Sequence, residues 1–225
     1  MNNIKKDKNT KIAALIPCLN EEKTIALTIK NIKKFCSKID IYVCDNGSTD
    51  QTSQIAKSLG AYVIREERKG KGYAMDRLFQ HVNADYYFMV DGDNTYDVSE
   101  FNKHFDIMLA EEVDMLIGVR NDYENNTFPK GHKFGNKLFN KAIEICFGKG
   151  ITDVLSGYRI LSKKYVKSFP NLSRKFDIEV EMSVHALELN VKIIEQNIKY
   201  FKRPEGSFSK LNTYSDGLKI LSRII

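Results

Sequence analysis

Residues 84–94 read ADYYFMVDGDN, an apolar run rich in aromatic residues that ends in two aspartates separated by one glycine. Residues 87–90 predict a buried strand of a parallel sheet, because such strands are apolar on both faces and end at turn residues. Asp91 and Asp93 then lie at the carboxyl edge of the sheet, where open α/β sheets bind ligands. Two carboxylates there can hold a divalent cation whose other ligands are phosphate oxygens, and Gly92 lets backbone approach closely. By itself the Asp-x-Asp spacing is more typical of a solvated turn.

The composition indicates a single globular unit. The chain has 225 residues, of which 42% are hydrophobic, enough for a substantial core. Its four cysteines show no CxxC spacing and lie mostly in apolar segments, which favours reduced core residues of a cytosolic protein. Residues 1–10 form a polar, flexible lead-in without the apolar segment of a secretory signal. No run reaches the ~18 to 20 apolar residues of a transmembrane helix.

The charge of the chain favours an anionic partner. The formal net charge is +6 and the pI is about 9.0, and the basic residues concentrate after Lys130. Phosphates or anionic lipid headgroups are the functional interpretation of this pattern. An ordinary solvated surface explains it equally well.

Strand-like and helix-like segments alternate through the first half of the chain. Three short apolar runs are predicted as strands: 11–17, 41–44 and 61–64. Asn20 is the expected cap of the first helix, and Ser48 or Thr49 is the expected cap of the second, which runs to Leu59. This alternation predicts right-handed βαβ units and a parallel sheet flanked by helices.

Residues 68–75, RKGKGYAM, form a basic turn with two glycines that opens a helix. Such a turn can present backbone N–H groups and Lys71 to a phosphate. It has neither the P-loop spacing nor the GxGxxG spacing, so an ordinary strand-to-helix turn is the alternative.

Residues 16–21 read IPCLNE, and residues 43–50 read VCDNGSTD. Together with Asp91 and Asp93, in order and in spacing, these segments resemble the family-2 glycosyltransferases with the GT-A fold. Their motifs there are IPxYNE, VDDGSTD and Asp-x-Asp. Leu19 replaces the usual tyrosine and Asn46 replaces the second aspartate of the middle motif.

This resemblance implies a Rossmann-like, mostly parallel sheet and a site for a UDP- or GDP-linked sugar. Mg²⁺ or Mn²⁺ is the implied cofactor, with Asp91 and Asp93 as its ligands. The implied contacts to the nucleotide sugar are Pro17, Leu19, Asn20, Glu21, Asp45, Lys71, Asp91, Gly92 and Asp93.

Five blocks in the second half resemble the polyprenyl-phosphate glycosyltransferases, the group of dolichol-phosphate mannose synthase. They are residues 117–120 (IGVR), 133–140 (KFGNKLFN), 150–159 (GITDVLSGYR), 176–181 (FDIEVE) and 203–211 (RPEGSFSKL). An acceptor phosphate suits arginine, which binds phosphate in a bidentate manner. The expected acceptor ligands are Arg120, Lys133, Ser156, Arg159, Arg203 and Lys210.

Three acidic residues of these blocks have open roles. Asp153 is expected beside the acceptor and the anomeric carbon, where it is a base for a hydroxyl acceptor, an orienting partner of an arginine such as Arg159, or a turn aspartate. Glu179 and Glu181 lie on a helix predicted over residues 176–189, which has Leu189 on its core side. The pattern favours a solvated face for both glutamates. The resemblance makes a functional role of Glu179 equally plausible.

The expected activity follows from the resemblance. A GT-A domain over residues 11–212, with Asp93, Asp153 and Arg120 as catalytic residues, is expected to transfer a sugar to a polyprenyl phosphate at the cytoplasmic membrane face, with inversion. Residues 213–225 are predicted to form an amphipathic helix that docks on the domain or lies on the membrane. The alternative is a saccharide acceptor in capsule or lipopolysaccharide assembly. A nucleic-acid binder would explain the charge but not the series of motifs.

Overall fold

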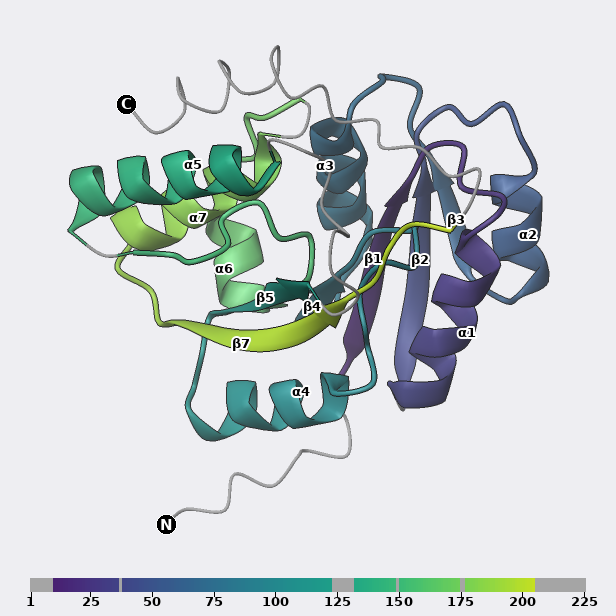
Figure 1. The fold of residues 1–225 in the computed structure, drawn as a ribbon. Helices are drawn as coiled ribbons and strands as arrows, with labels where there is room; N and C mark the ends of the chain where they lie inside the picture. The colour runs from purple at the N-terminus through teal and green to yellow at the C-terminus, as the bar shows by residue number, and fades with distance from the viewer. Residues whose placement is uncertain (1–9, 37, 123–131, 149, 175–176, 205–225) are drawn as a thin grey trace.

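The structure, a computed structural model, describes residues 10–36, 38–122, 132–148, 150–174 and 177–204. Within these ranges one seven-stranded sheet has the order β3-β2-β1-β4-β6-β5-β7, and helices lie on both of its faces (Figure 1). The strands are β1 Ile12–Cys18, β2 Ile39–Asp45, β3 Tyr62–Arg65, β4 Tyr86–Met89, β5 Met115–Asp122, β6 Arg159–Ser162 and β7 Ile193–Tyr200. The helices are α1 Ile25–Phe35, α2 Thr52–Ser58, α3 Lys71–His81, α4 Phe101–Ala110, α5 His132–Phe147, α6 Lys163–Ser168 and α7 Ile178–Glu188.

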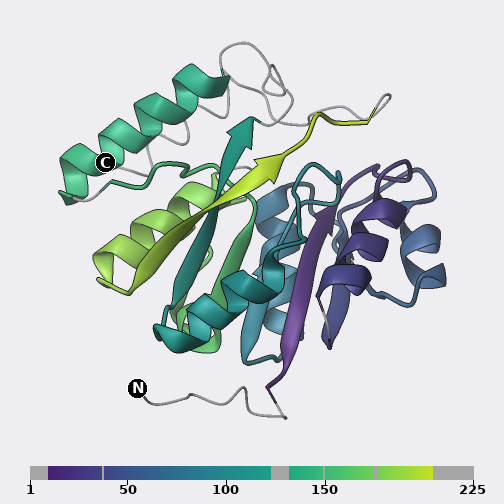
Figure 2. The ribbon, with the colours of Figure 1, turned by 60° about the horizontal axis from the view of Figure 1, so that its bottom comes forward.

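The sheet is mostly parallel, as predicted. Strand β6 alone runs against its neighbours β4 and β5, while the other pairings are parallel. Figure 2 shows β1, β5 and β7 pointing the same way across the molecule. Six strands therefore end at one edge, and loops that follow distant strands meet there.

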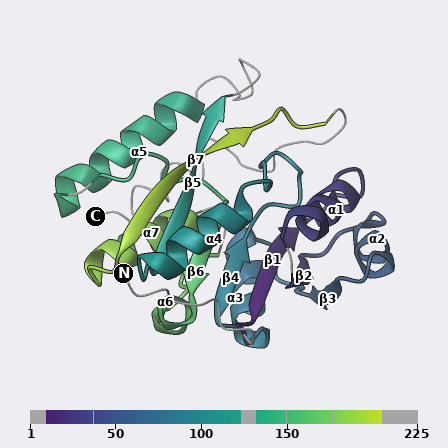
Figure 3. The ribbon, with the colours of Figure 1, turned by 90° about the horizontal axis from the view of Figure 1, so that it is seen from below.

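Two apolar clusters, one on each face, explain why the central strands are hydrophobic throughout. In β1, Ala13 and Leu15 join the cluster beneath α3, α5, α6 and α7. Ala14 and Ile16 join the opposite cluster beneath α1, α2 and α4. Figure 3 shows α4 beside β5 and β6, and α1 beside β1 and β2. A strand covered on both faces has no polar side. The apolar run before Asp91 indicated such a strand.

The predicted helix caps are wrong. Helix α1 begins after Thr24, and α2 begins after Gln51. Asn20 has a φ of 52°, and its side chain accepts the N–H of Thr49 at 2.8 Å, while the N–H of Asn20 donates to Ser48 Oγ at 3.0 Å. These polar residues join the loops after β1 and β2 to each other, and so fix both loops at the sheet edge.

The solvent exposure of residues in and just after helix α7 differs from the prediction. Glu179 and Glu181 are buried rather than solvated, and Leu189, expected on the core side, is 49% exposed. Glu181 accepts the backbone N–H groups of Leu172 and Ser173 at 2.7 and 2.6 Å. A carboxylate that satisfies two loop amides can be buried at the start of a helix, where the helix dipole also favours it.

The predictions for the chain ends concern residues that are largely outside the described ranges. Of the lead-in 1–10, only Thr10 is described, and the predicted helix 213–225 and Lys210 lie outside. Across residues 10–204, as far as they are described, no helix is both long and apolar enough to cross a membrane.

Candidate active site

The polar ends of β1, β2 and β4 lie together at the carboxyl edge of the sheet. Cys18 pairs with Asp45 in the β1–β2 register, and Leu15 pairs with Met89 of β4. The segment from Asp91 to Asp93 therefore follows β4 directly beside the loop after β1. Thr28 Oγ1 of α1 donates to the carbonyl of Gly92 at 3.1 Å and fixes this segment.

Asp91 is paired with a buried lysine. Lys71 Nζ, from the first residue of α3, lies 2.5 Å from Asp91 Oδ1 and also contacts the carboxylate of Glu179. Burial alone would lower the pKa of Lys71, but the two carboxylates raise it. Burial favours neutral Asp91, yet the attraction of Lys71 lowers its pKa overall. Lys71 and Asp91 therefore both stay ionised.

Asp93 is more deeply buried than Asp91 and is held on two sides. Its Oδ1 accepts the N–H and hydroxyl of Thr95 at 3.1 and 2.6 Å, and its Oδ2 lies 2.5 Å from Arg203 Nη2. Burial and the charge of Asp91 raise the pKa of Asp93. Arg203 reaches this position because Phe201, just after β7, donates its N–H to the carbonyl of Thr95 at 2.8 Å.

The two aspartates have the donor chemistry of a divalent cation site. Their carboxylate oxygens suit Mg²⁺ or Mn²⁺, and they are close enough that the charge of Asp91 adds to burial in raising the pKa of Asp93. Among the residues that the structure describes, no group of three His, Cys, Asp or Glu side chains forms a complete metal site. The residues fit a cation that takes its other ligands from a phosphate.

Arg120 and Asp153 form a bidentate pair. Arg120, on β5, donates its Nε and Nη2 to the Asp153 carboxylate at 2.7 and 2.6 Å, and its backbone N–H donates at 3.0 Å. Asn136 Nδ2 of α5 adds a bond of 2.9 Å to the same carboxylate. Asp153 therefore bonds to an arginine, as one of its three predicted roles requires. Its partner is Arg120 and not Arg159.

Arg159 and Ser156 are not placed to bind an acceptor, and these two predictions are wrong. Arg159 is completely buried and donates to the carbonyl oxygens of Ser156 and Val154 at 3.1 and 2.8 Å. Burial lowers its pKa. The hydroxyl of Ser156 is also buried and donates to the carbonyl of Gly118 at 2.5 Å. Both residues hold the loop before β6 in place.

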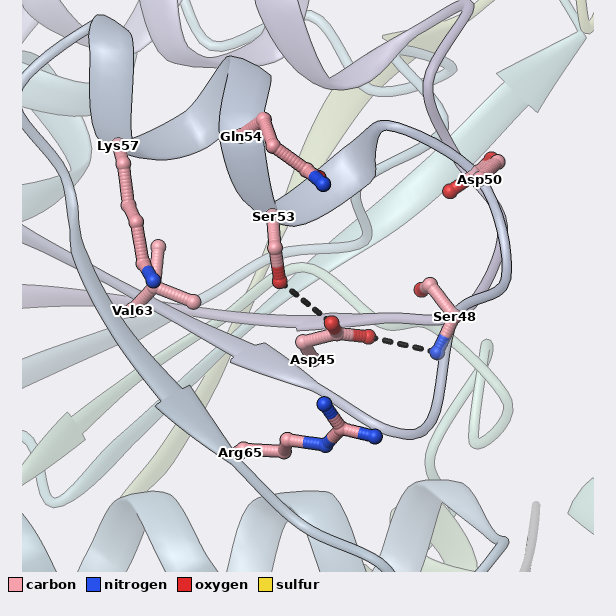
Figure 4. A pocket seen from close by; sticks show the side chains of 8 residues that line it. All are labelled: Asp45, Ser48, Asp50, Ser53, Gln54, Lys57, Val63 and Arg65. Carbon is pink, nitrogen blue, oxygen red and sulfur yellow. Dashed lines mark hydrogen bonds between the residues drawn. The ribbon is translucent and has the colours of Figure 1, made fainter.

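A polar cavity of about 280 Å³ lies beside Asp45, between α2 and β3 (Figure 4). Asp45 accepts the N–H of Ser48 at 2.8 Å and the hydroxyl of Ser53. Lys57 and Arg65 bring positive charge to the same cavity. Its lining residues are Asp45, Ser48, Asp50, Ser53, Gln54, Lys57, Val63 and Arg65.

The remaining predicted residues lie around this edge of the sheet or outside the described part of the chain. Pro17 and Leu19 are partly exposed at the end of β1, and Glu21 is buried and accepts the hydroxyl of Thr24 at 3.0 Å. The backbone of Lys133 lies in α5. Its side chain, like all of Lys210, is outside what the structure describes.

Residues 13–169 match the family model described as Glycosyl transferase family 2. The chain belongs to this family. It is a glycosyltransferase with the GT-A fold, as the motifs predicted. The match spans β1 to α6 and so contains the aspartates after β4 and the Arg120–Asp153 pair.

Individual glycosyltransferases are similar to this chain in sequence, and a solved structure is similar to it in fold. Glycosyltransferase AglJ of Haloferax volcanii is 33% identical over 208 residues, which are 92% of this chain and 68% of that protein. Dolichyl-phosphate hexose transferase of the same organism is 24% identical over 95% of this chain and 92% of its own. Glucosyl-3-phosphoglycerate synthase of Mycobacterium tuberculosis, solved with Mn²⁺, UDP-glucose and phosphoglyceric acid, has a TM-score of 0.76 and 23% identity. That match covers 96% of this chain and 80% of the other.

Asn46, where this family-2 sequence departs from VDDGSTD, shapes the turn that presents Lys71. Its Nδ2 donates to the carbonyl oxygens of Glu66 and Arg68 at 3.2 and 2.7 Å. Its Oδ1 accepts the N–H of Gly70 at 2.7 Å. An amide can both donate and accept, whereas an ionised aspartate only accepts. The sequence analysis missed this function because the turn lies in a separate segment.

Gly157, beside Ser156 in the loop before β6, lies directly against Asp91. A Cβ at this position would lie 2.5 Å from Asp91 Oδ2, so the loop before β6 packs its backbone on the Asp91 carboxylate. Gly92 serves packing too, since its Cβ would lie 2.5 Å from Cys18 Sγ. The close approach predicted at Gly92 is therefore to a core side chain of β1.

Proposed function

We propose that this glycosyltransferase moves a sugar from a nucleoside diphosphate sugar to a polyprenyl phosphate at the cytoplasmic face of a membrane, with inversion. One observation carries the proposal. The carboxylates that suit a metal and a diphosphate lie beside an arginine that suits a second phosphate, since Lys71 and, to a smaller degree, Arg203 and Arg120 lower the pKa of Asp91 against the effect of burial. Donor and acceptor anions would thus meet at one edge of the sheet.

A divalent cation, Mg²⁺ or Mn²⁺, would be held by Asp91 and Asp93. It would neutralise the charge that develops on the departing nucleoside diphosphate. The mycobacterial synthase of similar fold is described with Mn²⁺ and UDP-glucose, which supports this assignment. Lys71 and Arg203 balance the two carboxylates within the protein.

The nucleoside would lie on the β1 and β2 side of the edge. The residues proposed to surround it are Pro17, Leu19, Asn20, Glu21 and Asp45. A carboxylate accepts N–H groups, and both uracil and guanine present one on their pairing edge. The polar cavity beside Asp45 has room for such a group. A UDP- or GDP-linked sugar is therefore the proposed donor.

The geometry of Asp153 favours a phosphate over a hydroxyl acceptor. A hydroxyl acceptor must lose a proton, so a carboxylate has to be available as a base. Both oxygens of Asp153 accept donors from Arg120, and Asn136 adds a third side-chain bond. A lipid phosphate is already ionised near neutral pH and needs no base. The name of the dolichyl-phosphate hexose transferase supports this choice.

The proposed partner surface is the basic second half of the chain. A peripheral contact with anionic lipids would bring the polyprenyl phosphate to Arg120. Lys133, an expected acceptor ligand, lies in this basic half of the chain. Arg203, which pairs with Asp93, would be shared between the metal side and the acceptor side.

The test is transfer by the purified protein with a panel of nucleotide sugars and a short polyprenyl phosphate, with the glycolipid identified by mass. Asp93→Asn is expected to lower turnover by several orders of magnitude, because a metal contributes several kcal/mol to the transition state. Asp97→Asn, the same change in the same loop, is the matched control, because the Asp97 carboxylate accepts the N–H of Ser99 at 2.9 Å and forms no ion pair with Lys71, Arg120 or Arg203 in the described structure.

Three results would contradict the proposal. The first is near-normal turnover of Asp93→Asn, and the second is full activity of the unmodified enzyme in excess chelator. The third is product from saccharide acceptors but from no polyprenyl phosphate. Thermal unfolding of both variants shows whether a loss of turnover reflects the site or the fold.

A further inference from the structure

A second carboxylate, Glu195, lies behind the Arg120–Asp153 pair. Glu195 Oε1 accepts the N–H of Thr152 at 2.8 Å and the N–H of Asp153 at 3.3 Å. Its Oε2 accepts the hydroxyl of Thr152 at 3.0 Å. The Glu195 carboxylate thus accepts three hydrogen bonds from Asp153, the partner of Arg120, and from the preceding residue Thr152.

The position of Glu195 is fixed by the sheet. It lies on β7, directly opposite Ile117 in an eight-residue parallel pairing with β5, the strand that carries Arg120. Asp153 lies instead between α5 and β6, outside any helix or strand. The orientation of Asp153 therefore depends on bonds to its neighbours, and Glu195 ties it to the same pair of strands as Arg120.

These bonds are well suited to positioning and contribute little to the core. Glu195 is half-buried, and its bonds to Thr152 are exposed to solvent. Water can therefore replace the lost acceptor when Glu195 is removed, and the fold tolerates the change. Water cannot fix the direction of the Asp153 carboxylate, because its own position is not fixed.

We propose that Glu195 is a positioning residue for the acceptor phosphate site. It holds Thr152 and Asp153 so that Asp153 aims the guanidinium of Arg120 at the acceptor. The inference rests on the proposed function, in which Arg120 binds the phosphate of the lipid.

Three variants test the inference by steady-state kinetics with a short polyprenyl phosphate and the best donor. Glu195→Ala is expected to raise the acceptor KM about tenfold and to change the donor KM less than about twofold. Glu195→Gln should restore most of the loss, since its oxygen still accepts both N–H groups and the Thr152 hydroxyl can turn to accept its amide. Asn197→Ala, exposed on the same face of β7, is the control without effect.

A double variant distinguishes positioning from a separate effect. In an Arg120→Lys background, Glu195→Ala should add little to the acceptor KM, because the second change acts through the first residue. The inference would be overturned if the two changes raised the acceptor KM by factors that simply multiply. It would also be overturned if Glu195→Ala raised the donor KM and the acceptor KM equally. An unchanged acceptor KM in Arg120→Lys alone would instead overturn the proposed function.

Hydrogen exchange gives a measurement that does not depend on the acceptor. The backbone N–H of Arg120 donates to the Asp153 carboxylate, so Glu195→Ala should speed exchange at Arg120 as well as at Thr152 and Asp153. The exchange of residues in α3 should not change. Unaltered exchange at Arg120 would refute positioning by Glu195 whatever the enzyme transfers.

Discussion

Replacing Gly157 by alanine should disable the site with little harm to the fold. The added Cβ would lie 2.5 Å from Asp91 Oδ2, 3.0 Å from Asp91 Cγ and 3.2 Å from Asp91 Oδ1. The loop has little freedom to withdraw, because the N–H of Gly157 donates to Tyr96 at 2.8 Å and Ser156 is bonded to Gly118. The carboxylate of Asp91 must therefore move, and it moves against its bond to Lys71.

The size of the effect follows from this displacement. Non-bonded heavy atoms normally lie about 3.5 Å apart or more, so Asp91 has to shift by about 1 Å. A misplacement of that size costs about 10²-fold in rate, or about 2.7 kcal/mol of transition-state stabilisation. Overpacking of the fold itself costs ~1 to 3 kcal/mol, which for a chain of this length lowers the unfolding midpoint by only several degrees.

The assay compares kcat/KM for sugar transfer with the thermal shift that Mn²⁺ and a nucleoside diphosphate produce. Gly157→Ala should lose about 10²-fold in kcat/KM. With ligand at a few times the Kd of the unmodified enzyme it should also lose most of the shift, because the stabilisation depends on the logarithm of one plus the ratio of ligand concentration to Kd. Gly150→Ala is the control, since a Cβ there meets nothing within 4 Å. Transfer by Gly157→Ala within about threefold of the unmodified enzyme would refute the reasoning, because the clash predicts ~10².

Two further predictions distinguish Arg120, proposed to bind the acceptor, from Arg159, which is buried in the fold. Arg120→Lys keeps the charge but loses the planar fork, so the acceptor KM should rise about tenfold with a small change in the unfolding midpoint. Arg159→Lys should leave both KM values unchanged and lower the unfolding midpoint by several degrees, because buried carbonyl groups lose their donors. Kinetics and thermal unfolding of the two variants check this. A selective rise in the acceptor KM of Arg159→Lys would contradict it. Glu66, whose pKa is lowered to about 2 by its bonds to Arg68 despite burial, stabilises the fold above its ordinary pKa of 4.5, and this contribution is lost as pH falls toward 2. Glu66→Gln should therefore lower the unfolding midpoint at pH 7 but not at pH 2, and an equal difference at both pH values would contradict the assignment.

The features that could be predicted from the sequence are those governed by local pattern. The apolar run of residues 87–90 indicated a strand buried on both faces, and the alternation with helices indicated a parallel sheet. Both are confirmed, because hydrophobic periodicity reports which faces are covered. The position of Asp91 and Asp93 at the sheet edge follows directly from where that strand ends.

The partners of the charged residues could not be predicted, because they depend on strand order. Asp153 lies six residues before Arg159 in the chain, so a local pairing was the natural expectation. Strand β6 enters the sheet antiparallel between β4 and β5, which buries the Arg159 side chain and brings Arg120 to Asp153. The local pattern favoured a solvated Glu179 for the same reason, since its partner Lys71 lies on another helix, and only the resemblance pointed to a functional role.

The charge balance of the site supports the proposed need for a divalent cation. Buried ion pairs cost desolvation energy and are weak evidence of stability, so a concentration of them at a ligand-binding edge indicates function. Among the described residues, the ion pairs of this cluster join five carboxylates, Asp91, Asp93, Asp153, Glu179 and Glu21, to three cationic groups, Lys71, Arg120 and Arg203. The carboxylates therefore outnumber the cationic groups by two. A diphosphate and a lipid phosphate bring further negative charge, which the cluster cannot balance from its own side chains. A divalent cation at Asp91 and Asp93 would supply that balance and would leave Arg120 for the acceptor.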